Sequence, residues 1–363
     1  MSALPVDDER SKRPGLRAMT SRRVAIILFN LGGPDGQDAV RPFLFNLFND
    51  KAIIGAPQPI RFALAALISS TRAKAAKANY ARMGGGSPIL PETMKQAEAL
   101  EKAIAQRVDN VTFKCFSAMR YWRPFVKDAA KAAEDWGATD VILLPLYPQF
   151  STTTTASSLS AWRRASKLPA STICCYPISR GFAQAHADAI LDAWRKAGAP
   201  AEPRVLFSAH GLPQRVIERG DPYQWQVEQS VAAVRKLLPA EWQIRICYQS
   251  RVGPLKWIGP STEEEIRRAG TDRAGVIVAP IAFVSEHIET LVELDIEYAQ
   301  LARTLKLPFY LRAPALGAGS AFIEALADMV ERALSAPGVT QTHEGGRLCP
   351  AAWGMCPASS GAR

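Results

Sequence analysis

The chain has 363 residues, of which 48% are hydrophobic and 21% are charged, and its formal net charge is +10. This length and composition are typical of a globular enzyme with one large domain or two ordinary ones. The Lys and Arg residues are scattered without a nucleic-acid-reading motif, which excludes a nucleic-acid partner, and no uninterrupted apolar run approaches the roughly 20 residues that span a bilayer.

The first 22 residues form a polar segment. They lack the apolar core of a signal peptide, and the consecutive acids Asp7, Asp8 and Glu9 argue against a mitochondrial transit peptide. We therefore expect a disordered tail over residues 1–22 and a cytoplasmic protein.

Short apolar runs alternate with amphipathic helical stretches along the rest of the chain. Runs that are apolar on both faces are typical of central strands in a parallel sheet, and strand–helix alternation predicts right-handed βαβ units in a doubly wound α/β fold. Two similar domains are expected, over residues 23–182 and 183–336, followed by a Gly- and Pro-rich tail over 337–363. The runs begin at Val24, Val111, Asp140 and Ser171 in the first series, and at Arg204, Trp242, Ala274 and Pro308 in the second.

Two neighbouring segments of the first half are unusually apolar. Residues Phe43–Phe48 read FLFNLF, and Ile60–Lys77 is apolar first and basic afterwards. One interpretation is a buried helix with a solvated basic end. The other is an apolar lip that rests on the inner face of the cytoplasmic membrane or receives a lipophilic substrate.

Several unusual residues follow predicted strands, where ligands bind in open α/β sheets. His210 comes directly after the run RVLFSA, and the chain has only four His. No G-x-S-x-G motif surrounds Ser208, so a hydrolase triad is not expected. The loop Leu28–Gly36 contains glycines but no nucleotide-binding fingerprint. Arg82 precedes the loop MGGGSP, where it could hold a carboxylate.

Aromatic, hydroxyl and cationic residues follow other strands in the same way. The segment YPQFSTTTTASS from Tyr147 carries more hydroxyl groups than helix capping requires. The segments Arg120–Trp122 and Tyr248–Trp257 add aromatic rings and arginines. Together they suit a flat, hydrophobic ligand that carries carboxylates.

The segment Ser285–Tyr298 predicts an acidic helix. It spaces Glu289, Glu293 and Glu297 four residues apart and contains no Lys or Arg. Like charges at this spacing repel. A solvated face is one interpretation, and the other is a path for a divalent cation, or a protonated carboxyl, beside His287.

Eight segments in order together resemble the ferrochelatase family, from about Val24 to Ser335: LFNLGGPDG, ARMGGGSPI, AMRYWRPF, YPQFSTTTTASS, FSAHGLP, GDPYQWQ, YQSRVGPLKWIGP and FVSEHIETLVELDIEY. The resemblance implies two Rossmann-like doubly wound parallel-sheet domains with a cleft between them. It implies insertion of Fe²⁺ into protoporphyrin IX with release of two protons, the final step of haem synthesis.

The resemblance also implies roles for individual residues. His210 and Glu289 would be catalytic and would contact the metal, and whether His210 acts as base, as metal ligand or as both stays open, with the base favoured. The acidic metal path would continue through His287, Glu286, Glu293 and Glu297, although the family usually has Asp at the position of Glu286. Arg82 would hold a propionate. The porphyrin pocket and its lip would comprise Arg120, Tyr121, Trp257, Tyr147, Ser151, Leu31, Leu47 and Phe48.

Some members of the family carry a [2Fe–2S] cluster on four Cys, one in the hydroxyl-rich loop and three in the C-terminal tail. In this chain the loop position is Thr152, and the tail offers Cys349 and Cys356. Cys174 and Cys175 fall in a predicted strand. We therefore predict no cluster and no other cofactor.

Three other functions remain as alternatives. A chelatase could insert another metal, such as Co²⁺ into a corrin precursor. A carrier of haem or porphyrin would need the pocket without the acidic path. A nucleotide-binding enzyme would need a phosphate cradle, which the glycine loops do not offer. The expected partners are protoporphyrin IX, Fe²⁺ and, through the lip, a membrane surface.

Overall fold

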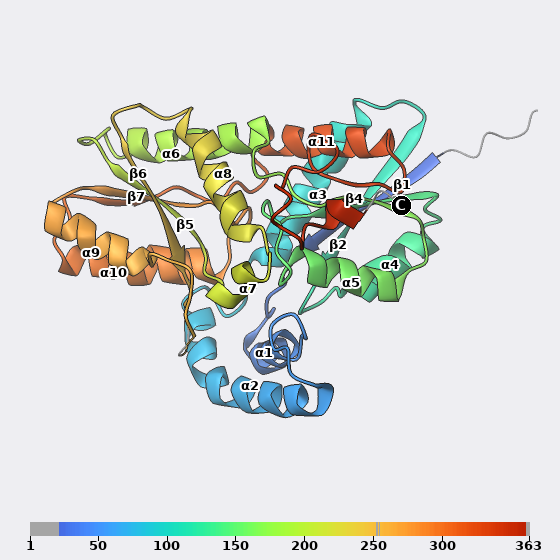
Figure 1. Cartoon of the computed structure of the whole chain (residues 1–363), viewed down its shortest axis with the longest axis horizontal. Coiled ribbons are helices and arrows are strands. Elements are labelled where there is room, and N and C mark those ends of the chain that lie inside the picture. The colour runs from blue at the N-terminus through green and yellow to red at the C-terminus, as the bar shows by residue number, and fades with distance from the viewer. Residues whose placement is uncertain (1–21, 252, 254, 361–363) are drawn as a thin grey trace, which may run out of the picture.

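A computed structural model describes residues 22–360 of the chain, apart from 252 and 254. Of the tail expected over residues 1–22, only Arg22 is among these, and it begins the first strand. The described residues form two parallel sheets flanked by helices (Figure 1). The first sheet contains β1 (Arg22–Asn30), β2 (Val111–Met119), β3 (Asp140–Pro145), β4 (Ala170–Ile173) and β9 (Thr340–Gln341), and the second contains β5 (Arg204–His210), β6 (Gln243–Gln249), β7 (Val276–Pro280) and β8 (Tyr310–Arg312).

The strands confirm the expected fold class. Each predicted apolar run contains a strand, and the order is β2-β1-β3-β4-β9 in one sheet and β6-β5-β7-β8 in the other. The central strands β1 and β5 are buried along almost their whole length, as strands covered on both faces by helices must be. The first four strands of both sheets therefore share one order, and every strand pair is parallel.

Helices connect the strands and cover both faces. In the first half they are α1 (Val40–Phe48), α2 (Gln58–Ala81), α3 (Ile89–Ala105), α4 (Val126–Asp135), α5 (Thr155–Ala165) and α6 (Arg180–Lys196). In the second half they are α7 (Gln214–Glu218), α8 (Tyr223–Arg235), α9 (Thr262–Asp272), the π-helix η2 (Glu289–Tyr298), α10 (Ala299–Thr304) and α11 (Ser320–Leu334). Short 3₁₀ turns occur at Gln37–Ala39 and Pro357–Ser360.

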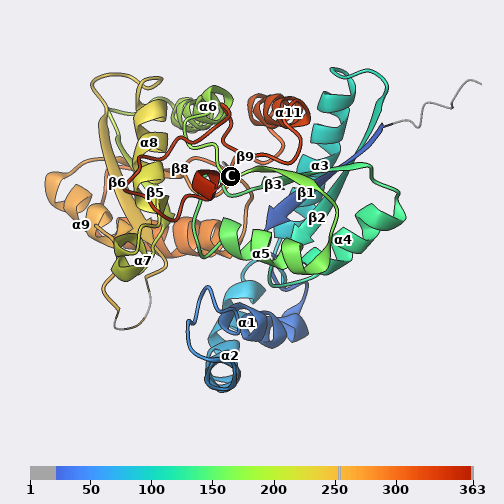
Figure 2. The ribbon, with the colours of Figure 1, turned by 45° about the vertical axis from the view of Figure 1, so that its right-hand side comes forward.

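The chain crosses between the two sheets near both ends of the second half. The boundary expected after residue 182 falls inside α6, and α11 packs against α3 of the first half as well as against α6 (Figure 2). The segment expected to be a tail after residue 336 returns to the first sheet and adds β9 beside β4. One hydrophobic core accordingly joins both sheets, from Val24 and Ile26 on β1 to Val205 and Phe207 on β5.

The helices α1 and α2 form an arm that projects from the body of the molecule (Figures 1 and 2). Part of α2 is buried against α1, yet four large apolar side chains of α2 are 37–61% exposed: Ile60, Phe62, Leu64 and Leu67. Among the helices that the structure describes, none combines the length and hydropathy needed to cross a bilayer.

Candidate active site

The chemically reactive residues meet at the carboxyl ends of β5, β6 and β7. His210 is the last residue of β5 and lies opposite Gln249, the last residue of β6. The chain that leaves β7 turns into η2, whose first residue is Glu289. Parallel strands end at the same edge of a sheet, so the fold itself brings these side chains together.

His210 and Glu289 form a hydrogen-bonded pair. His210 Nδ1 lies 2.8 Å from Glu289 Oε2. Burial alone would lower the pKa of His210, but the negative charges of Glu289 and Glu293 outweigh it and the pKa is raised. Burial alone would raise the pKa of Glu289, but His210 and other neighbours lower it to about 2. Because Nδ1 is taken by Glu289, Nε2 is the nitrogen that can take a proton or bind a metal.

Ser250 and Gln249 hold the carboxyl groups of Glu289 and Glu293 beside each other. The Ser250 hydroxyl lies 2.9 Å from Glu289 Oε2 and 2.6 Å from Glu293 Oε2, and its backbone N–H donates to Glu293 Oε1 at 2.9 Å. Gln249 Nε2 donates to Glu293 Oε2 at 3.1 Å. Ser250 has a φ of 61°, which is strained for a residue other than glycine and is typical of functional sites.

The two carboxyl groups differ in their electrostatic environment. Burial and then the negative charge of Glu289 raise the pKa of Glu293, whereas the pKa of Glu289 is lowered. Two neighbouring carboxyls with pKa values pushed apart give one group that stays ionised and one that can carry a proton. Glu289 and Glu293 can therefore take part in acid–base chemistry.

The acidic segment is a π-helix and not the regular helix that the sequence predicts. Backbone hydrogen bonds in a π-helix span five residues, and such turns are rare and frequent at functional sites. Two tyrosines hold the widened turns. Tyr310 OH donates to the Leu294 carbonyl at 2.8 Å, and Tyr298 OH donates to Glu293 Oε1 at 3.0 Å. In this conformation Glu289 and Glu293 both reach Ser250.

His287 lies beside the pair as a neutral imidazole. Burial lowers the pKa of His287, and Nδ1 lies 3.2 Å from the Ser285 carbonyl, so that nitrogen carries the proton. Nε2 is left as the acceptor, 3.9 Å from Glu289 Oε1. The ring of Phe283 packs 4.5 Å from that of His287 and 6.5 Å from that of His210, centroid to centroid. A neutral imidazole is the form that binds divalent metals.

Arg312 neutralises two other acids of this segment. Arg312 Nη1 lies 2.7 Å from Glu286 Oε1, and the same guanidinium makes two contacts of 2.6 and 2.8 Å with Asp295. Burial would raise the pKa of Glu286, but Arg312 lowers it. The segment itself contains no Lys or Arg, and Arg312 compensates these two acids from β8.

Arg82 and Glu297 form an exposed ion pair, with Arg82 Nη1 3.4 Å from Glu297 Oε1. Of the residues predicted to contact the metal, Glu289 contacts His210, and Glu293 is joined to Glu289 through the Ser250 hydroxyl. The structure does not bring Glu286 and Glu297 into that group, because arginines engage them.

An apolar cluster from the first half faces this group. Tyr80 of α2 belongs to the cluster, and burial together with the negative charge of Glu289 raises the pKa of Tyr80. Four predicted pocket residues lie in the cluster, together with the residue directly before Glu289: Leu31, Leu47, Phe48, Tyr121 and Ile288.

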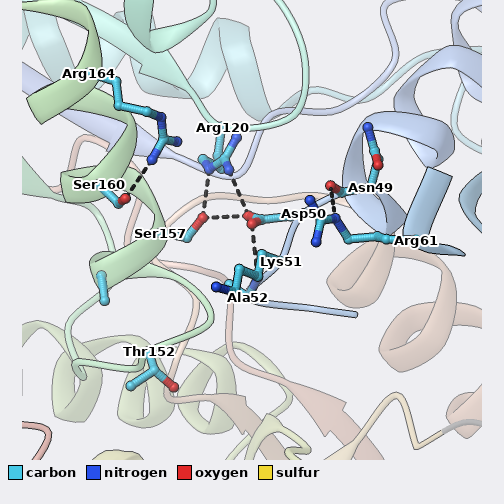
Figure 3. A pocket seen from close by; sticks show the side chains of 11 residues that line it. Asn49, Asp50, Lys51, Ala52, Arg61, Arg120, Thr152, Ser157, Ser160 and Arg164 are labelled. Atoms are coloured by element: carbon cyan, nitrogen blue, oxygen red, sulfur yellow. Dashed lines mark hydrogen bonds and ion pairs between the residues drawn. The ribbon is translucent and has the colours of Figure 1, made fainter. Parts of the chain in front are cut away.

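Arg120 lines a pocket of about 510 Å³ next to this cluster (Figure 3). Arg120 Nη2 lies 2.8 Å from Asp50 Oδ2, and its Nε donates to Ser157 Oγ at 2.7 Å. Tyr121 OH donates to the same Asp50 oxygen at 2.9 Å. Asp50 is buried, so it fixes Arg120 and Tyr121 relative to each other. The other cations that line the pocket are Lys51, Arg61 and Arg164.

Comparison with known proteins decides the family. The model of the ferrochelatase family matches residues 23–334. The chain belongs to the ferrochelatase family. It is 58% identical over 345 residues to a ferrochelatase of Caulobacter vibrioides, an alignment that covers 94% of this chain and 99% of the relative. It is 44% identical over 344 residues to a ferrochelatase of Rickettsia bellii, with 93% and 96% covered.

A solved structure supports the fold. The sirohydrochlorin chelatase SirB from Bacillus subtilis subspecies spizizenii, determined in complex with cobalt, matches with a TM-score of 0.50 at 11% identity. The match covers 86% of this chain and 96% of that one. At this identity the likeness bears on the fold alone, and it agrees with the two parallel sheets of this ferrochelatase family member.

The other predicted pocket residues are buried or half-buried. Ser151 is buried and its hydroxyl donates to Asp221 Oδ2 at 3.0 Å, which ties the hydroxyl-rich loop to the second half of the chain. Tyr147 is buried, and Arg120 lies close enough to influence its pKa. Trp257 is half-buried beside Gly211, where a Cβ would lie 3.5 Å from Trp257 Cε3. Trp257 therefore lies beside the residue that directly follows His210.

Sequence reasoning missed the residues that position the reactive groups. Ser250, Arg312 and Asp50 are polar residues at strand or helix ends, which is the only signal that they offer. Their function depends on partners 17 to 107 positions away in the sequence, as the contacts of Arg312 with Asp295 and of Asp50 with Ser157 illustrate.

The cysteines also differ from expectation. Cys174 and Cys175 lie after β4, which ends at Ile173, and not within a strand as predicted. Within the described part of the chain, no group of three or more His, Cys, Asp and Glu side chains could hold a metal ion.

Proposed function

We propose that this chain is a ferrochelatase that inserts Fe²⁺ into protoporphyrin IX and releases two protons. The family match supports this function. The observation that carries it is the His210–Glu289 pair, 2.8 Å apart at the strand ends and close to an apolar cluster. Fe²⁺ is a substrate of this reaction and leaves within the product.

The reaction needs a base and a distorted macrocycle. The neutral porphyrin loses two N–H protons and gains a dication, so charge is conserved. Its rigid ring must bend before the nitrogen lone pairs point to one face, and binding energy from apolar walls can supply that strain. His210 Nε2 accepts a pyrrole proton. The ionised Glu289 stabilises the imidazolium that forms, through its contact with Nδ1.

The second half of the chain also supplies the side chains that bind the metal. Fe²⁺ accepts carboxylate and imidazole ligands, and Glu289 and the Nε2 of His287, 3.9 Å from Glu289 Oε1, offer one of each. Glu293 has a raised pKa, so it takes up and passes on a proton more readily than an ordinary carboxylate. Ser250 connects Glu289 to Glu293, which makes it the relay between His210 and solvent.

The first half binds the porphyrin. Leu47, Phe48 and Tyr121 provide the apolar wall. Arg120 lies beside them, and Arg82 exchanges Glu297 for a propionate when the porphyrin binds. A guanidinium suits a carboxylate because it can donate two parallel hydrogen bonds.

The exposed apolar side chains of α2 suit a peripheral membrane contact. Ile60, Phe62 and Leu67 are more than half exposed, and such residues insert at the boundary between lipid headgroups and acyl chains. Replacing Phe62 and Leu67 together by Ser should reduce co-sedimentation with vesicles of an anionic phospholipid. Equal co-sedimentation of the variant and the native chain would refute this contact.

The function is tested by following the loss of the free-base porphyrin spectrum. Purified protein with protoporphyrin IX and anaerobic Fe²⁺ should give haem over many turnovers. Insertion of Co²⁺ into a reduced corrin precursor, without insertion of Fe²⁺ into protoporphyrin, would establish the other chelatase. Stoichiometric porphyrin binding without any metal insertion would establish a carrier.

A further inference from the structure

The pocket of about 510 Å³ that Arg120 lines is formed by the arm and the body of the molecule together (Figure 3). The arm supplies residues 49–52, from the connection between α1 and α2, and Arg61 of α2. The body supplies Arg120, which follows β2, together with Thr152 and residues of α5. The volume is that of a small-molecule site. The function proposed above gives Arg61 and the other cations beyond Arg120 no role.

The lining of this pocket is strongly basic. Four of the lining residues are cations and one is an acid: Lys51, Arg61, Arg120, Arg164 and Asp50. The acid is already engaged, because Asp50 is buried and its Oδ2 lies 2.8 Å from Arg120 Nη2. Among the described residues, no carboxylate lies within ion-pair distance of Lys51, Arg61 or Arg164. Cations that share one cavity repel each other, so an anionic ligand would stabilise them.

Arg61 is held in place by the connection between α1 and α2. Its Nε donates to the Asn49 carbonyl at 3.0 Å and its Nη1 donates to the Ala56 carbonyl at 2.7 Å, while its Nη2 contacts the Gln58 side-chain oxygen. A guanidinium has five N–H donors, so these contacts leave donors for a ligand. A cation that is already fixed loses little conformational freedom when it binds an anion.

One face of α5 forms the opposite wall. Ser157, Ser160 and Arg164 follow one another at spacings of four residues or fewer, which places them on the same side of the helix. Arg164 Nη1 donates to Ser160 Oγ at 2.6 Å. Ser160 accepts this bond, so its own O–H remains a donor. Hydroxyl and guanidinium groups are common donors to phosphate oxygens.

The composition of the lining argues against other ligand classes. Among the described residues that line the pocket, none carries an aromatic ring or a large apolar side chain. A porphyrin, a nucleobase or an acyl chain would need such walls. A small polar anion does not need them, and an anion with more than one negative charge matches several cations.

We propose that this pocket binds a phosphate group, carried by a small soluble anion or by the headgroup of an anionic phospholipid. A phosphate ester presents three terminal oxygens and up to two negative charges, and a guanidinium can donate two parallel hydrogen bonds to them. Lys51 and Arg61 hold the group from the arm, and Arg164 holds it from the body. A lipid is included as a source because Ile60 and Phe62, on either side of Arg61 in the sequence, are exposed.

The bound phosphate links the arm to the body. Cations from both parts contact one ligand, and their mutual repulsion is removed. The connection over residues 49–57 should therefore open less often when the site is filled. Hydrogen exchange of this segment should become slower in saturating pyrophosphate. Unchanged exchange in protein that has bound pyrophosphate would refute the link.

Titration calorimetry of the full chain with pyrophosphate, in buffer free of metal and phosphate, measures the binding. We expect one site per chain with a Kd below about 1 mM, and an affinity that falls as the salt concentration rises. Citrate is the comparison anion, because it carries carboxylates in place of phosphates. Absence of binding at millimolar pyrophosphate, or tighter binding of citrate, would overturn the proposal.

Variants identify the residues that bind the anion. Lys51→Gln and Arg164→Gln should each weaken pyrophosphate binding by about 10-fold or more, because each removes a charged donor. Arg163→Gln is the matched control on α5, since Arg163 lines a different pocket. Lys74→Gln is the control on α2. All four side chains are exposed, so the variants should fold. Equal affinities in the variants and their controls would contradict the assignment.

Vesicles distinguish the two sources of phosphate. If the source is a lipid, vesicles that contain phosphatidic acid should bind the native chain more tightly than the Arg164→Gln variant, and pyrophosphate should compete. If the source is soluble, the native chain and the variant should bind these vesicles equally. Competitive displacement of pyrophosphate by protoporphyrin IX would overturn the proposal, because the anion would then be a propionate. None of these titrations depends on metal insertion, so their failure leaves the proposed function standing.

Discussion

The two sheets share one strand order, yet the residues at their carboxyl ends differ in kind. In the first sheet β1 leads into Asn30 and Leu31, and the neighbouring segments contribute apolar side chains and Arg120. In the second sheet β5 ends in His210, and η2 adds Glu289. The same topology thus provides a binding surface in one half and titratable groups in the other.

This division predicts different kinetic effects for substitutions in the two halves of the chain. Substitutions in the second half should lower kcat, because they remove interactions made in the transition state. Substitutions in the first half should mainly raise the KM for porphyrin. A substitution in one half that has the kinetic effect expected of the other half would contradict this division.

The largest effect is expected for Glu289→Gln. It removes the charge that stabilises protonated His210, so kcat should fall by about 10²- to 10⁴-fold, with porphyrin affinity unchanged within about twofold. Asp295→Asn on the same π-helix is the control, because Asp295 is paired with Arg312. Metal insertion and fluorescence titration with porphyrin measure the two quantities. A Glu289→Gln variant with native kcat would refute the assigned role.

The next largest effect is expected in the dependence of the rate on pH. A base must be neutral, so the rate should rise as pH increases through the raised pKa of His210. The negative charge of Glu293 contributes to that raised pKa, so Glu293→Gln should move the rising limb to lower pH. The profile of kcat/KM against pH measures the shift. A limb that moves to higher pH in this variant would contradict the electrostatic account.

Ser250→Ala should lower kcat by about 10-fold. The variant loses the hydroxyl that contacts Glu289 and Glu293 but keeps the backbone N–H that binds Glu293. Ser335→Ala, at the exposed end of α11, serves as the control. Steady-state metal insertion provides the measurement, and an unchanged kcat would show that the hydroxyl plays no part in the relay.

Asp50→Asn tests the first half. Arg120 would lose its buried anionic partner, and such losses cost about 1–3 kcal/mol of stability. The KM for porphyrin should rise about 3- to 10-fold with kcat nearly unchanged. Asp38→Asn is the control, since Asp38 is fully exposed. A lowered kcat at unchanged KM would place Asp50 with the residues of the second half.

The smallest effect is expected at the exposed pair of Arg82 and Glu297, because surface ion pairs contribute about 0–1 kcal/mol. Arg82→Gln should raise the KM for porphyrin about 2- to 5-fold, since a propionate loses its partner. Glu297→Gln should leave that KM unchanged or lower it. Equal increases in both variants would show that the ion pair itself, and not carboxylate binding by Arg82, matters.

The sequence predicts the strands and the reactive pair well for a physical reason. A buried parallel strand must be apolar throughout, and a polar residue at its end is conspicuous, as His210 is after RVLFSA. Strand ends converge by topology, so their residues can be grouped without coordinates.

Other features depend on long-range packing and could not be read from the sequence. The π-helix is held by Tyr310, which donates to the Leu294 carbonyl from another strand. The charge balance of the acidic segment depends on Arg312, 26 positions from Glu286. The apolar run that predicts a strand through Cys174 and Cys175 continues past the point where β4 ends, so only the fold reveals that their sulfurs meet.

The division between binding and chemistry is tested most directly by the structure of the chain with a porphyrin that cannot be metallated. We predict that the macrocycle packs against Tyr121 and the apolar cluster, with its nitrogens about 3–3.5 Å from His210 Nε2, a distance suited to proton transfer. A macrocycle bound away from His210, or held without contact to the apolar cluster, would contradict the account.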